Sequence, residues 1–281
     1  MVEPLRRAPN TGRFVVLGCG HTGTTLVSGI LHINGYGSFG VSRLFENLRL
    51  NDLNRRLLSG SEVDESELRG FIMEVEERTG GRWCLKDPRL SETADRFYRY
   101  VPGPLMVIFN YRHPGTTVRS LIREREEHES HLTAEQMQAS AEEEWLSRNR
   151  AALAFLDGRN RSPLLITRYD DLVDHQLDEV LCRFVGRSLD LSFIEPSRRR
   201  SAPVSVRQEL LDLYEELNAR YEVNRRGILE TTKPVPVRPT SGRTARTRIH
   251  VETNRIVNGI RWRRERVSKL LATPRGAERT T

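Results

Sequence analysis

The sequence predicts an α/β fold of three layers, in which a central parallel sheet is flanked by helices. Two observations support this fold. Short apolar runs of β-type residues recur along the chain, and long polar stretches of helical character separate them. Connections of that length favour parallel pairing. The predicted strands are Phe14–Leu17, Trp83–Leu85, Leu105–Phe109 and Leu164–Thr167.

A glycine loop follows the first apolar run and predicts an anion site. The residues Gly18–Thr25 lie between a strand and the helix-like stretch Leu26–Leu31, with the G-x-x-x-x-G spacing of a nucleotide P-loop. Glycines let backbone N–H groups converge, and a helix N-terminus adds partial positive charge. Thr24 and Thr25 stand where an ATP- or GTP-binding loop has lysine followed by serine or threonine. We therefore expect a P-loop-like fold, although a turn that needs glycine for steric reasons alone is the alternative.

The helices between the strands carry recognisable start signals. Capping boxes are expected at Asp64-x-x-Glu67 and at Thr133-x-x-Gln136. The predicted helices are Leu44–Leu58, Glu65–Arg78, Thr133–Phe155 and Gln208–Tyr221.

The composition changes near residue 230. Three prolines within 231–239 forbid a helix, so residues 1–230 are expected to form the α/β domain and residues 231–281 a linker and a basic extension. Val251–Leu271 predicts a basic helix that docks on the core, on a partner or on an acidic surface, and a homodimer is the other arrangement considered. The formal net charge is +7, with much of the excess near the C-terminus.

The remaining composition points to a cytoplasmic bacterial protein. Three widely spaced cysteines, Cys19, Cys84 and Cys182, suggest neither a disulfide framework nor a metal site. No leader peptide or transmembrane segment is expected. Only three of the 45 basic residues are lysines, which fits a GC-rich bacterial genome.

A second anion motif follows the third apolar run. Arg112 lies three residues after the predicted strand, Pro114 suits the first turn of a helix, and Ser120 lies eight residues after Arg112. Both side chains are expected to face the crevice above the sheet and to grip one phosphate, since a guanidinium binds phosphate bidentately. The alternative is an exposed arginine and an ordinary helix serine.

These motifs together resemble the sulfotransferases that use 3′-phosphoadenosine 5′-phosphosulfate (PAPS) and release adenosine 3′,5′-bisphosphate (PAP). The resemblance covers about Phe14–Leu172 and includes a Tyr-Asp-Asp-Leu segment, 169–172, and Lys86-Asp-Pro-Arg89. It implies that the first loop binds the 5′-phosphosulfate, that Arg112 and Ser120 bind the 3′-phosphate, and that Tyr169 lies beside the nucleotide. The loop residues implied are Gly20, His21, Thr22, Gly23, Thr24 and Thr25.

Two departures from the family pattern are visible. His21 stands where many members have lysine or arginine, and the usual C-terminal Arg-Lys-Gly loop is not evident. The run Arg198, Arg199 and Arg200 is a candidate replacement that would meet the 3′-phosphate; a solvated surface patch is the alternative.

The resemblance also suggests catalytic roles. Glu46 is expected to be the base that deprotonates an acceptor hydroxyl, with Asp87 in reserve, because glutamates at this place serve as bases in several sulfotransferases. A solvent-facing helix glutamate is the alternative. His21 is expected to donate to the leaving oxygen or sulfonate, and Lys86 to stabilise the sulfonate or orient Glu46. No metal is expected.

Two other functions stay open at this point. An atypical P-loop kinase would require magnesium and a lysine near the phosphates, and a basic nucleic-acid-binding protein would show steep salt dependence. The acceptor of the sulfotransferase reaction is left open among a sugar, a lipid and a secondary metabolite.

Overall fold

Four parallel strands form a sheet in the spatial order β2-β1-β3-β4. The structure is a computed structural model, and it describes residues 12–128, 131–158, 162–194 and 202–237. Each of the four predicted apolar runs is a strand, so the sheet is confirmed. The strands are β1 (Gly12–Leu17), β2 (Arg82–Lys86), β3 (Met106–Tyr111) and β4 (Leu164–Arg168).

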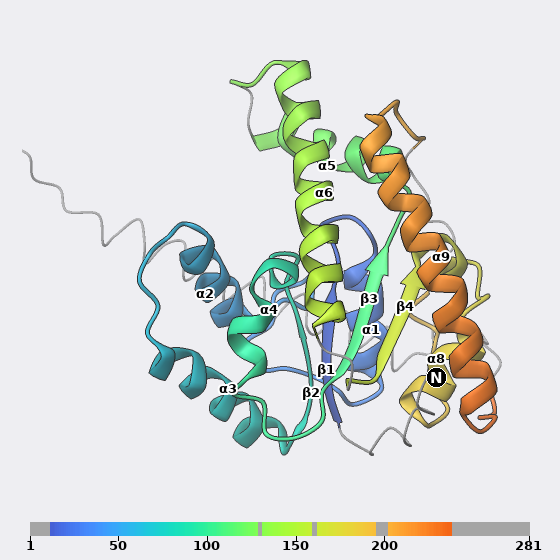
Figure 1. Ribbon diagram of the computed structural model, residues 1–281. Helices are drawn as coiled ribbons and strands as arrows, with labels where there is room; N and C mark the ends of the chain where they lie inside the picture. The colour runs from blue at the N-terminus through green and yellow to red at the C-terminus, as the bar shows by residue number, and fades with distance from the viewer. Residues whose placement is uncertain (1–11, 129–130, 159–161, 195–201, 238–281) are drawn as a thin grey trace, which may run out of the picture.

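Helices cover both faces of this sheet, which confirms the three-layer architecture. Figure 1 shows α1 behind the strands and the long α6 in front of them, while α9 runs beside β4. The helices of the described residues are α1 (Thr24–Ile33), α2 (Leu48–Leu58), α3 (Glu65–Thr79), α4 (Leu90–Tyr98), α5 (Pro114–His128), α6 (Ala134–Asp157), α7 (Tyr169–Val173), α8 (Asp178–Val185) and α9 (Gln208–Thr231).

The helix starts follow from local side-chain chemistry. The box at Thr133 forms in full, because the Thr133 hydroxyl accepts from the Gln136 N–H and the Gln136 side chain accepts from the Thr133 N–H. At Asp64 the expected box does not form: Asp64 caps the helix by accepting from the Ser66 N–H at 2.8 Å, while Glu67 pairs with Arg56.

The predicted helix Leu44–Leu58 was placed four residues too early. The observed α2 begins at Leu48, and the Asn47 side chain caps it by accepting from the N–H groups of Arg49 and Leu50. Phe45 has φ of 58°, a left-handed conformation that a helix does not accommodate.

The last helix is ten residues longer than predicted. Beyond Tyr221, α9 stays attached to the sheet because Asn224 donates to the Leu164 carbonyl and accepts from the Ile166 N–H at the exposed edge of β4. Ile228 is buried one turn later. These contacts hold the helix to Thr231 despite Gly227 in its last turns.

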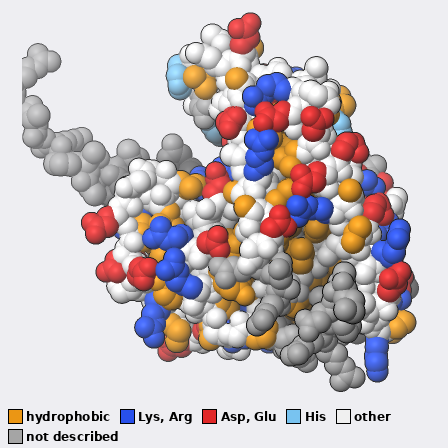
Figure 2. All heavy atoms as spheres, in the orientation of Figure 1, with side chains coloured by type: hydrophobic (Ala, Val, Ile, Leu, Met, Phe, Trp, Pro, Cys, Tyr) orange, Lys and Arg blue, Asp and Glu red, His pale blue; other side chains and the backbone are white. Residues whose placement is uncertain are grey.

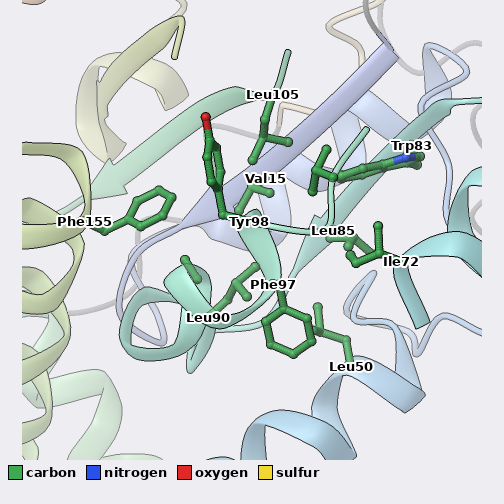
Figure 3. A pocket seen from close by; sticks show the side chains of 12 residues that line it. Val15, Leu50, Ile72, Trp83, Leu85, Leu90, Phe97, Tyr98, Leu105 and Phe155 are labelled. Carbon is green, nitrogen blue, oxygen red and sulfur yellow. The ribbon is translucent and has the colours of Figure 1, made fainter. Parts of the chain in front are cut away.

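A small apolar cavity lies in the core between the sheet, α2, α3, α4 and α6. Figure 3 shows side chains from these elements converging on it, among them Val15, Leu85, Phe97 and Phe155. Its volume is about 20 Å³. A single water molecule needs most of such a space, so the cavity is a packing defect and no binding site for an acceptor.

All three cysteines are buried thiols. Burial, followed by the nearby Glu144 carboxylate, raises the pKa of Cys19 to about 12, and burial raises that of Cys84 to about 12. Both therefore stay protonated at neutral pH and have no thiolate to offer as a nucleophile. Across the described ranges, no helix is both long enough and apolar enough to cross a bilayer.

Candidate functional site

The candidate site lies where the strand order changes direction. From β1 the chain moves to β2 on one side and then to β3 on the other, so β1 and β3 are neighbours although β2 lies between them in the sequence. Crossover connections diverge at such a point and leave a crevice beyond the carboxyl ends of the strands. The glycine loop after β1 and Arg112 after β3 are both at this edge.

Two glycines in the loop adopt conformations that other residues avoid. Gly18 has φ of 144° and Gly23 has φ of 96°. A Cβ on Gly18 would stand 2.2 Å from the Asn110 carbonyl oxygen, and one on Gly23 would stand 2.3 Å from the Tyr169 ring. Both positions therefore need glycine for its backbone freedom and for the close approach of neighbouring groups.

Buried polar bonds hold the loop against β3. The Thr22 hydroxyl donates to the carbonyl oxygens of Cys19 at 2.8 Å and Asn110 at 3.1 Å. The Asn110 side chain donates to the Thr22 carbonyl at 2.5 Å and accepts from the Thr167 hydroxyl at 2.7 Å. The Thr22 side chain thus stabilises the conformation of the loop. Asn110 belongs to none of the sequence motifs described above, although a polar residue inside an apolar strand is a visible signal.

We expect Asn110→Ala to lower the free energy of unfolding by about 2–4 kcal/mol, because it removes the Asn110 amide that bonds the buried Thr22 carbonyl and leaves the Thr167 hydroxyl with only its longer bond, to the Phe109 carbonyl at 3.4 Å. Urea denaturation at pH 7 measures the change. Asn51→Ala on α2 is the matched control and should cost less than about 0.5 kcal/mol. Equal stability of the two variants would contradict the assigned role of Asn110.

Arg112 and Tyr169 form one unit beside the loop. The Arg112 guanidinium lies over the Tyr169 ring at 4.4 Å from its centroid, and Nη1 reaches the His21 carbonyl oxygen at 3.5 Å. Arg112 is only 6 % exposed, so it is not the exposed arginine of the alternative interpretation. A guanidinium stacked on a ring is held in plane for bidentate binding of an oxyanion.

Ser120 lies on α5, where its hydroxyl donates to the Thr116 carbonyl at 3.1 Å. Pro114 begins this helix, as predicted. Gly115 lies against a later segment of the chain, since the Val204 N–H donates to its carbonyl at 3.2 Å. That Arg112 and Ser120 grip one phosphate stays a prediction.

Lys86, Glu46 and Thr25 form a connected group. The Lys86 ammonium, at the end of β2, donates to Glu46 Oε1 at 2.6 Å and to the Thr25 hydroxyl at 3.2 Å. The Lys86 side chain is 2 % exposed, and a buried ammonium requires such partners. The arrangement joins the glycine loop to Glu46 through one cation. That Lys86 orients Glu46 for catalysis stays a prediction.

Glu46 does not lie on a helix. A tight turn carries it: Ser42 N–H donates to the Glu46 carbonyl at 2.7 Å, and Val41 and Asn47 form an antiparallel bridge. Phe45 packs edge-on against Phe193, with ring centroids 5.5 Å apart. The carboxylate is therefore fixed by its neighbours on both sides, and the solvent-facing helix glutamate is excluded.

Asp87, the reserve base, has a structural contact of its own. Its Oδ1 accepts from the Arg89 N–H at 2.8 Å and Oδ2 lies 3.5 Å from the Arg89 guanidinium. The residue is fully buried in the turn between β2 and α4. The contacts of Asp87 thus lie within its own turn, whereas Glu46 is the carboxylate bonded to Lys86.

His21 pairs with Glu124, which belongs to none of the sequence motifs described above. His21 Nε2 lies 2.8 Å from Oε2 of Glu124 on α5. Glu124 follows Ser120 by four residues, so the helical spacing places the two on one face of α5. That spacing is a signal the sequence offers once Ser120 is assigned to the site.

An ion cluster supports the loop near Gly20. Arg125 donates to Glu144 at 2.6 Å, and Glu144 also pairs with Arg148. A Cβ on Gly20 would lie 3.7 Å from Glu144 and 3.8 Å from Arg148. Because Arg125 and Glu144 come from α5 and α6, the cluster fastens both helices beside the loop.

Some predicted features lie outside the described residues: Arg198, Arg199 and Arg200, and the basic extension beyond residue 237. Within the described ranges, no three His, Cys, Asp or Glu side chains converge as a metal-binding group would.

Figure 2 shows acidic and basic side chains intermingled over the described part of the face it displays. That face lacks the continuous basic stripe expected of a nucleic-acid-binding surface.

Comparisons with known proteins give a structural match without a sequence match. Neither a model of a known protein family nor a curated protein matches the chain. Among solved structures, the sulfotransferase domain from the curacin biosynthetic pathway matches with a TM-score of 0.54 and 17 % identity, over 74 % of this chain and 98 % of that domain.

Two further structures are more distant. The sulfotransferase domain of the Synechococcus PCC 7002 olefin synthase has a TM-score of 0.49 at 16 % identity, over 73 % of this chain and 94 % of that domain. Sulfotransferase STF9 from Mycobacterium avium has a TM-score of 0.43 at 15 % identity, over 84 % of this chain and 79 % of that protein. The structural conclusion rests on the curacin-pathway domain: the chain shares the fold of a sulfotransferase, as the motifs predict.

Proposed function

We propose that the chain is a sulfotransferase that moves a sulfuryl group from PAPS to an acceptor hydroxyl. One observation carries this proposal: Lys86 bonds at once to Thr25 of the glycine loop and to Glu46. The Lys86 side chain thus bridges the proposed anion site and the proposed carboxylate base, so the two lie close together. In-line transfer to a hydroxyl requires that proximity.

The described residues fit the nucleotide. The loop from Gly20 to Thr25, with helix α1 behind it, suits the 5′-phosphosulfate, because glycine conformations and a helix N-terminus suit an oxyanion. Arg112 and Ser120 would bind the 3′-phosphate, and Tyr169 would lie beside the nucleotide. Arg112 and Tyr169 support this role because they are already stacked beside the loop.

The chemistry divides between donor and protein. PAPS supplies a sulfur whose bond to the 5′-phosphate oxygen breaks as the acceptor oxygen bonds to it. Glu46 takes the acceptor's proton on Oε2, since Lys86 holds Oε1. Lys86 offers its positive charge to the transferring sulfonate, and His21 donates toward the leaving oxygen.

Exposed apolar side chains beside Glu46 indicate the kind of acceptor. Leu44 is 44 % exposed and Leu48 is 39 % exposed, two residues to either side of Glu46. An acceptor with an apolar part would cover them and gain from their burial. We expect kcat/KM at least about tenfold higher for a long-chain alcohol than for a monosaccharide, since a few buried CH₂ groups supply that difference. Measuring kcat/KM for both acceptors with PAPS as the donor checks this prediction. Equal values would contradict an apolar acceptor.

Calorimetric titration tests the function class directly. PAP is expected to bind with a Kd in the micromolar range or below, while ATP with magnesium binds far more weakly. The reverse order would favour an atypical P-loop kinase. Indifference to both nucleotides, with steeply salt-dependent binding of DNA or RNA, would favour the nucleic-acid-binding alternative.

A further inference from the structure

We propose that Glu124 is a positioning residue that lets His21 donate to the bound nucleotide only when the imidazole carries both protons. The inference rests on the proposed function. The contact behind it joins His21 Nε2 and Glu124 Oε2 at 2.8 Å. It adds a role for Glu124 that the family resemblance does not contain, because lysine or arginine at the same place needs no such partner.

The backbone fixes His21 at the mouth of the loop. Its φ is 62°, in the left-handed region, and its carbonyl accepts from Arg112 Nη1 at 3.5 Å. The main chain therefore directs the ring, and Glu124 selects which ring nitrogen faces α5. With Nε2 facing Glu124, Nδ1 is the nitrogen that remains for a ligand oxygen.

The ionised carboxylate accepts hydrogen bonds and donates none. It therefore favours a proton on Nε2. A neutral His21 then presents a lone pair at Nδ1, which repels an oxyanion. Only the doubly protonated ring donates from Nδ1 while Nε2 stays bonded to Glu124.

The surrounding charges keep Glu124 ionised. The hydrogen bond from His21 lowers the pKa of the Glu124 carboxyl, with further lowering by the positive charges of His21, Arg125 and His128 and opposed by burial. Arg112, which reaches the His21 carbonyl, Arg148, near Gly20, and Lys86, bonded to Thr25, are further cations beside the loop. Glu124 is thus an acceptor throughout the pH range in which imidazoles titrate.

The consequence is a pH-dependent affinity. The doubly protonated ring gives way to the neutral ring as the pH rises, so donation from Nδ1 is lost in that direction. PAP carries the leaving oxygen on its 5′-phosphate, so its affinity reports the donation. The phosphates of PAP also titrate. His21→Lys, which stays charged throughout, therefore serves as the reference.

Calorimetry with PAP at pH 6 and pH 8 tests the proposal. Relative to His21→Lys, we expect the affinity of the wild type to fall about tenfold from pH 6 to pH 8, the value of one charge-assisted hydrogen bond. Glu124→Gln should reduce the fall to below about threefold, because the amide also donates to Nε2 and leaves a proton for Nδ1. Glu126→Gln, on another face of α5, is the control of equal charge and should keep the wild-type profile.

A second measurement needs no ligand. Nitrogen NMR of the imidazoles should find the neutral ring of His21 protonated on Nε2 in the wild type and in Glu126→Gln, and a loss of that preference in Glu124→Gln. An Nδ1-protonated neutral ring in the wild type would overturn the proposal whether or not PAP binds. Identical pH profiles for wild type and Glu124→Gln would also overturn it while leaving the sulfotransferase function intact. Failure of the wild type to bind PAP, with the expected NMR result, would instead count against the function.

Discussion

Arg112→Ala should weaken the binding of PAP at least about a hundredfold. Two charge-assisted hydrogen bonds from one sheltered guanidinium are together worth roughly 3 kcal/mol or more, which corresponds to that factor. The side chain is buried and stacked on Tyr169, so it is held in place before the ligand arrives. Calorimetric titration at pH 7 measures the loss.

Two variants make this result specific. Arg226→Ala removes an equal charge from the exposed surface of α9, near the opposite edge of the sheet, and should leave the affinity within about twofold. Arg112→Lys keeps the positive charge but loses the paired N–H donors of the guanidinium, and should recover only part of the affinity. Unchanged PAP binding by a folded Arg112→Ala protein would remove the second anion site from the proposal.

Glu46→Gln should lower kcat by about 10²–10⁴-fold, the usual contribution of a general base. Affinity for PAP should change much less, because the glutamine still accepts from Lys86 through its carbonyl oxygen and keeps the turn 41–47 closed. Single-turnover rates with saturating PAPS, combined with PAP titration, separate the two effects.

The matched control is Glu77→Gln, an exposed carboxylate on α3 away from Lys86. It should leave both turnover and affinity unchanged. Turnover that survives in Glu46→Gln, together with lost turnover in Asp87→Asn of unaltered stability, would transfer the role of base to Asp87.

The sheet could be predicted because its strands are short apolar runs between long polar stretches. Each run ends within two residues of the end of its strand, and these strands end at Lys86, Tyr111 and Arg168. The residues at the end of β2 and just after β3 were therefore expected at the crevice. The start of α2 could not be placed in the same way. The positive φ of Phe45 and the capping by Asn47 depend on the turn as a whole. Neither feature can be derived from the helix propensities of the residues.

The parts of the site that could be predicted are the ones whose residues form short motifs in the sequence. The glycine loop, Arg112 and Pro114 are adjacent in sequence to strand ends, and their positions follow from that adjacency. The partners Asn110 and Glu124 were missed because they act across 88 and 103 residues of sequence. Such contacts are set by the order of the strands, which no single segment encodes.

The three sheltered thiols give the molecule built-in reporters of local opening. Cys19 lies in the glycine loop, Cys84 in β2 beside Lys86, and Cys182 in α8. Each reacts with an alkylating reagent only when its surroundings open, so three modification rates measure three different regions of one folded chain. Nucleotide that tightens the glycine loop would then slow the first rate selectively, and the protection of a single sulfur would map where the ligand binds.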